Sequence, residues 1–108
     1  MRITFASLDE MISEMKEKGV SEVRLSPMYE ERYSKSGLPL LKLLITVQAI
    51  ASPQIILHFE KITFRGIKPL SKEEIKRLFE ENLMETERIK SRLSREGFNP
   101  MPGYLFDE

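Results

Sequence analysis

Apolar side chains recur at intervals of three and four residues in two parts of the chain, the spacing that keeps them on one face of a helix. In the first part the recurring residues are Leu8, Met11, Ile12 and Met15. Ser7 and Glu10 form a capping box ahead of them, and Gly19 offers a left-handed stop. The pattern predicts a helix over about residues 8 to 18, whose apolar face is typical of a core.

The second helical pattern is longer. Apolar residues repeat from Ile75 to Leu93, after a second capping box of Ser71 and Glu74 and before Gly97. The helix predicted here spans about 39 Å, because each of its roughly 26 residues rises 1.5 Å. Strands of about six to ten residues reach only about 20 to 33 Å. We therefore expect the last two turns of this helix to extend beyond the sheet.

Between the helices the period changes to two, which predicts strands over about residues 20–33, 40–50 and 54–66. Pro27 has no N–H for a ladder and favours a sheet edge for the first of them. Residues 2–5 also alternate and are expected to add a short edge strand. The predicted fold is α+β, an antiparallel three- or four-stranded meander with an N-terminal helix and a long C-terminal helix, in the order (β)αβββα.

The domain is expected to cover residues 1–98, with residues 99–108 as a C-terminal tail. Pro100 and Pro102 forbid a helix in this tail. Its last residues include Tyr104, Leu105 and Phe106, which are too apolar for a purely disordered end. We therefore expect the tail to dock on a protein surface.

The alternation of residues 54–66 changes phase halfway. A three-residue loop over residues 52–54 places Ala49 opposite Leu57 and Val47 opposite Phe59, apolar against apolar. The same register further on would set a charged Lys61 opposite Ile45. One extra residue at Glu60 and Lys61, a β-bulge, repairs the pattern, and we predict a bulge there. His58 then lies outside the core, on the surface.

The alternative interpretation has no bulge and gives the sheet a second, partly apolar face. The residues expected to contribute to this face are Leu44, Ile56, Ile62 and Phe64. Such a face needs a cover, either residues 104–106 of the tail or a second subunit. These four residues are the candidate self-association site.

Composition narrows the function classes. The chain has 17 Lys plus Arg and 17 Asp plus Glu, so its formal net charge is zero and no whole-molecule field attracts nucleic acid. It has no cysteine and one histidine, which excludes disulfides and the usual zinc sites and fits a cytoplasmic location. Charged residues make up 31%, a balance reported for heat-stable proteins. The longest apolar stretch is interrupted by Lys42, Gln48 and Pro53, so no membrane span is expected.

Candidate chemistry is sparse. His58 and Glu60 are two residues apart and offer an acid–base pair, but a lone histidine in a strand is more often structural. The five glycines are isolated, which excludes glycine-rich nucleotide loops. No catalytic residue, metal site or cofactor is assigned.

Four cations near the end of the long helix form the alternative, nucleic-acid-binding site: Arg88, Lys90, Arg92 and Arg95. Cations also favour a helix C-terminus for electrostatic reasons alone. The sequence therefore favours a small, non-enzymatic intracellular protein that acts through protein contacts and forms a homodimer, with nucleic-acid binding as the alternative.

Overall fold

The computed structural model describes residues 1–66 and 71–103. In this part of the chain, strands and helices follow one another in the order βαβββαβ. The strands are β1 (Arg2–Thr4), β2 (Glu22–Tyr33), β3 (Pro39–Ser52), β4 (Ile55–Gly66) and β5 (Asn99–Pro102), and the helices are α1 (Leu8–Glu17) and α2 (Lys72–Arg95). The α+β class is confirmed, but the predicted order (β)αβββα lacks the final strand.

The strands form a mixed sheet in the order β1-β4-β3-β2-β5. β2, β3 and β4 make an antiparallel meander, but β1 pairs in parallel with β4 and β5 in parallel with β2. The prediction of a purely antiparallel sheet is therefore wrong. The physical reason lies in the connections, because a hairpin reverses the chain whereas a helix that crosses the sheet returns it in the same direction.

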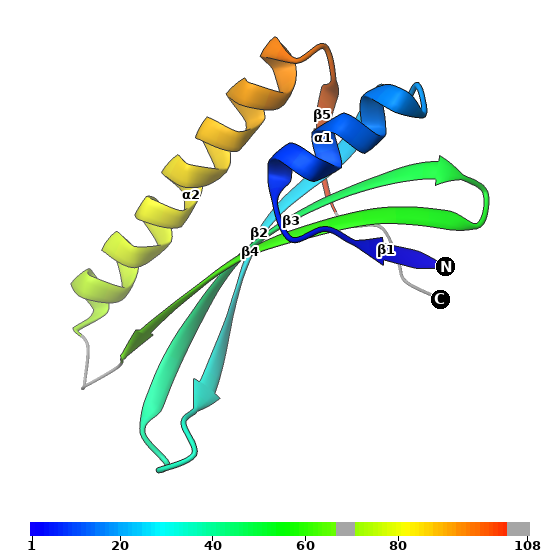
Figure 1. The fold of residues 1–108 in the computed structure, drawn as a ribbon. Helices are drawn as coiled ribbons and strands as arrows, with labels where there is room; N and C mark the ends of the chain where they lie inside the picture. Colours follow the sequence, from blue (N-terminus) through cyan, green and yellow to red (C-terminus); the bar gives the residue numbers. More distant parts are fainter. Residues whose placement is uncertain (67–70, 104–108) are drawn as a thin grey trace.

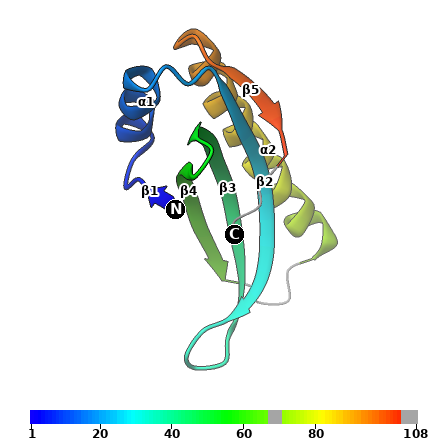
Figure 2. The ribbon, with the colours of Figure 1, turned by 90° about the vertical axis from the view of Figure 1, so that its right-hand side faces the viewer.

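Both helices are crossover connections between parallel strands. α1 joins β1 to β2 and α2 joins β4 to β5, and each connection moves three positions in the same direction across the sheet. Crossovers of this kind share one hand, so two that run in the same direction place both helices on the same face. Figure 1 shows α1 and α2 on that face. Figure 2 shows β5 beside β2 at one edge of the sheet and β1 beside β4 at the other.

The core lies between the sheet and the two helices. Its strand residues are Val23, Leu25, Ile45, Val47, Ala49 and Leu57, and its other members are Met11, Ile12, Met15, Ile89, Leu93 and Phe98. Ile89 and Leu93 belong to the last two turns of α2, so the expectation that these turns extend beyond the sheet is wrong. The chain must return from α2 to the sheet as β5, which holds this end of the helix over the core.

The register of β3 and β4 corrects the predicted bulge. Pairing runs without interruption from Ile50 opposite Ile56 to Leu40 opposite Gly66, so Lys61 does lie opposite Ile45. The one irregularity is between Ile50 and Ser52, beside the turn. Lys61 is tolerated there because it is exposed at the margin of the core, where its ammonium group reaches α2.

Candidate functional site

The four predicted self-association residues all lie on the second face of the sheet, the face that α1 and α2 do not cover. Leu44 lies directly opposite Ile62, with Met28 of β2 on its other side. The side chains of Ile62 and Phe64 are 42% and 54% exposed, whereas Leu44 is buried between its neighbours. Met28, Leu44, Ile62 and Phe64 therefore form a continuous apolar surface, called the β4 patch below.

Ile56 is separate from the β4 patch. It lies near the β3–β4 turn, opposite Ile50, and His58 and Glu60 stand between it and Ile62 along the strand. Residues 104–106, the intrachain cover predicted for this face, lie outside the described residues.

The outer edge of β4 beyond β1 has no partner strand among the described residues. Ile56 N–H donates to Met1 O at 2.9 Å and Phe5 N–H donates to His58 O at 2.8 Å, so even-numbered residues of β4 direct their backbone groups outward. β1 pairs only with residues 56–58. By strand alternation, the N–H and C=O groups of Glu60, Ile62 and Phe64 point to this free edge, beside the β4 patch.

The free edge of β2 is different. Asn99 N–H donates to Ser21 O at 2.7 Å, so odd-numbered residues of β2 direct their backbone groups toward β5. β5 ends where Pro102 lies opposite Leu25. The next residue of β2 whose backbone groups point to this edge is Pro27. Proline has no N–H, so the backbone hydrogen bonds between β2 and a neighbouring strand cannot continue there. The predicted preference of Pro27 for an edge is consistent with this position.

His58 is completely buried, and its prediction as a surface residue is wrong. Gln48 Nε2 lies 3.0 Å from His58 Nδ1, and His58 Nε2 lies 2.8 Å from Glu60 Oε1. An amide nitrogen only donates, so Nδ1 accepts and Nε2–H donates to the carboxylate. The structure thus brings together the predicted acid–base pair, but the exposed fraction of the imidazole is 0% and no substrate reaches it in this conformation.

Sequence reasoning missed Gln48, although a signal for it was present. The register that sets Ala49 opposite Leu57 also sets Gln48 opposite His58, on the second face. The alternation of side chains assigns both residues to this face. It does not reveal that this part of the face is buried.

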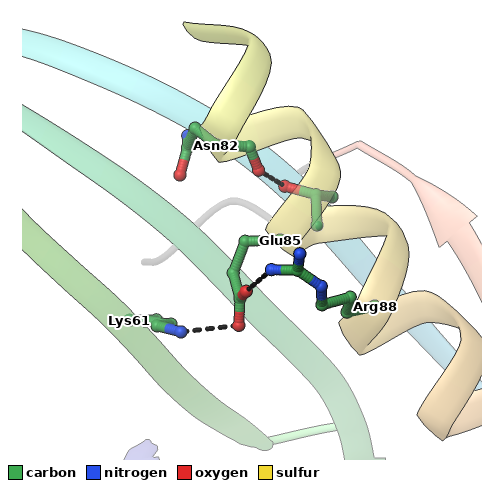
Figure 3. A network of polar contacts seen from close by, with 5 residues as sticks. Lys61, Asn82, Glu85 and Arg88 are labelled. Carbon is green, nitrogen blue, oxygen red and sulfur yellow. Dashed lines mark hydrogen bonds and ion pairs between the residues drawn. The ribbon is translucent and has the colours of Figure 1, made fainter. Parts of the chain in front are cut away.

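A cleft of about 300 Å³ separates α2 from β4 on the helix-covered face. Its floor includes Leu43 and Ile45, and its walls carry both cations and carboxylates. Lys61 Nζ lies 2.6 Å from Glu85 Oε1, and Arg88 Nη1 lies 2.8 Å from Glu85 Oε2. Figure 3 shows these two cations on either side of the carboxylate. Hydrogen bonds from Lys61 and Arg88 hold the pKa of Glu85 below its ordinary value.

Asn82, one turn before Thr86, fixes α2 to the sheet. Its Nδ2 lies 3.3 Å from the carbonyl oxygen of Leu44 and 3.5 Å from that of Met28. Thr86 Oγ1 donates to Asn82 O at 2.7 Å. These polar contacts explain why two hydrophilic residues interrupt the apolar stripe of α2.

Three of the four cations of the alternative site, Arg88, Arg92 and Arg95, recur at helical spacing on one face of α2, and Lys90 lies apart from them. Arg88 faces the cleft beside β4, and Arg92 pairs with Asp9 of α1. Lys90 lies on the other side of α2, where it lines a groove with Pro100 and Pro102 of β5. Two of the four guanidinium and ammonium groups are therefore already bonded to carboxylates of the same chain.

Neither helix in residues 1–66 and 71–103 is long and apolar enough to cross a membrane. In the same residues, no three histidine, aspartate or glutamate side chains gather as they do around a metal ion. No protein-family model, curated protein or solved structure matches the chain.

Proposed function

We propose that this protein acts through protein contacts and that it forms a homodimer through the β4 patch. The observation that carries the proposal is the exposure of Ile62 and Phe64 side by side on the sheet face away from the core. Exposed apolar surface of this kind marks interaction sites in soluble proteins. A cytoplasmic location, in keeping with a chain without cysteine, is part of the same proposal.

A second copy is favoured as the partner for two reasons. The formal net charge of the chain is zero, so two copies do not repel one another over long range. The patch also lies at an edge of the sheet, so a two-fold axis beside β4 brings two patches together. Burying four half-exposed side chains, Ile62 and Phe64 of each copy, contributes about 4 kcal/mol before the entropic cost of association.

Light scattering across a micromolar concentration series tests this proposal. The unaltered protein is expected to be a dimer at the higher concentrations, and Phe64→Lys is expected to be a monomer because a charge would enter the apolar interface. Met84→Lys is the matched control, since Met84 is similarly exposed (58%) but lies on α2, away from the patch. Circular dichroism must show both variants folded. A monomer at every concentration of the unaltered protein would contradict the proposal.

The alternative remains nucleic-acid binding through Arg88, Lys90, Arg92 and Arg95. It has weaker support, because Arg88 and Arg92 are paired within the chain and Lys90 lies on another side of α2. If the protein retains nucleic acid on a filter and this retention decreases as salt is added, nucleic-acid binding would be favoured over the dimer.

A further inference from the structure

We propose that the dimer forms by antiparallel pairing of β4 with β4 of a second copy, on a two-fold axis at Thr63. This inference rests on the proposed function and names the mode of association. It makes one continuous sheet of two five-stranded halves. Both features of β4 are then used at once: the outward backbone groups gain partners, and the β4 patches of the two copies meet.

The edge of β4 is suited to pairing, whereas the edge of β2 is not. Residues 55–66 contain no proline, but Pro27 removes a donor from the outer edge of β2 just where β5 ends. Pairing β4 with β2 of another copy would be heterologous and would leave further edges open. Pairing β4 with β4 is isologous and closes as a dimer.

The register follows from the direction of the backbone groups. Outward groups belong to even-numbered residues of β4, so an even-numbered residue must face an even-numbered one. The free edge begins at Glu60, just after His58 O is taken by Phe5, and the strand ends at Gly66. Only a dyad at Thr63 pairs the whole free edge from Glu60 to Gly66, since it sets Glu60 opposite Gly66 of the second copy.

The same dyad places Ile62 of each copy opposite Phe64 of the other. Four apolar side chains therefore meet on the second face. A dyad one residue earlier, at Ile62, would direct Gly66 toward His58 of the second copy, whose carbonyl is already bonded. The geometry therefore selects one register from the neighbouring ones.

The helix-covered face also accommodates the second copy. Among the described residues α2 packs chiefly over β2, β3 and β5, and a cleft of about 300 Å³ separates it from Lys61, Thr63 and Arg65 of β4. On this face Lys61 comes opposite Arg65 of the second copy. That pair of cations is compensated, because Lys61 is bonded to Glu85, and Glu81 lines the same cleft as Arg65.

Single-cysteine variants test the pairing cleanly, since the chain has no cysteine of its own. Thr63 directs its backbone groups toward β3, so it would face Thr63 of the second copy as a non-hydrogen-bonded pair, with Cα atoms about 4.5 Å apart. This separation is within the range of a disulfide. Under mild oxidation, Thr63→Cys is expected to convert to a covalent dimer far more completely than Tyr33→Cys, the control on the β2 edge.

Amide hydrogen exchange gives a second readout without substitution. The amides of Glu60, Ile62 and Phe64 are expected to become protected as protein concentration rises, whereas those of Tyr29 and Glu31 stay exchangeable. A dimer in which Thr63→Cys fails to cross-link and these amides stay unprotected would overturn the pairing but leave the proposed function intact. A protein that is monomeric throughout would overturn both.

Discussion

His58→Ala measures how much the buried polar cluster of the second face contributes to stability. The substitution removes two hydrogen bonds, from Gln48 at 3.0 Å and to Glu60 at 2.8 Å, and leaves a cavity where the imidazole was. Gln48 then loses an acceptor inside the protein, which costs about 1 kcal/mol or more. The Glu60 side chain is 31% exposed, so water replaces most of its lost bond. Loss of packing around a completely buried side chain adds about 2 kcal/mol.

The expected decrease in the free energy of unfolding is therefore about 3 kcal/mol, whereas substitution of a surface histidine stays within about 0.5 kcal/mol. Urea unfolding followed by circular dichroism distinguishes the two values. All samples need the same protein concentration, because a dimer gains stability by mass action. Glu60→Ala is the matched control and is expected to cost about 1 kcal/mol, since it removes one bond at a partly hydrated site. A His58→Ala variant as stable as the unaltered protein would refute the buried cluster.

Two further predictions concern α2. The pKa of the Glu85 carboxyl lies below its ordinary value of 4.5, so the stabilisation by its ionised form is full above that pH and is lost as pH falls through the lowered pKa. Glu85→Gln is expected to lower the free energy of unfolding by about 0.5–1 kcal/mol at neutral pH. In urea unfolding at decreasing pH, the difference in stability between this variant and the unaltered protein should disappear; a difference that does not depend on pH would contradict this. Ser71 Oγ accepts from Glu74 N at 3.2 Å, so Ser71→Ala should lower stability by about 1 kcal/mol and Ser71→Asp should restore it. Equal melting temperatures for Ser71→Ala and the unaltered protein would count against the cap.

Both helices were predictable because their signals are local. Ser7 and Ser71 each accept from the backbone three residues on, as a capping box requires, and Gly19 and Gly97 take the positive φ values of 69° and 94° that end the helices. β5 carried no such signal. Asn99–Pro102 contains two prolines and is a strand only because residues 22–25, far away in the sequence, provide an edge for it.

The predicted bulge failed because the sequence argument extended the core along the whole of β4. Alternation alone makes Lys61 opposite Ile45 look like a fault. In the folded chain α2 packs chiefly over β2, β3 and β5, on the same face as Lys61 but away from β4, so the core ends before Lys61. Its ammonium group meets Glu85 instead, a pairing of residues from separate elements that no local pattern reveals.

The absence of a bulge decides the face on which Ile62 and Phe64 lie. With a continuous register they share the second face with His58 and Glu60, and they are half-exposed there. A bulge at Glu60 would instead leave His58 on the second face and turn Ile62 and Phe64 into the core. In that case Phe64→Lys would unfold the protein, because a charge would enter the core. The continuous register requires the reverse, a folded monomer from Phe64→Lys, so circular dichroism of this variant tests the register while light scattering tests the dimer.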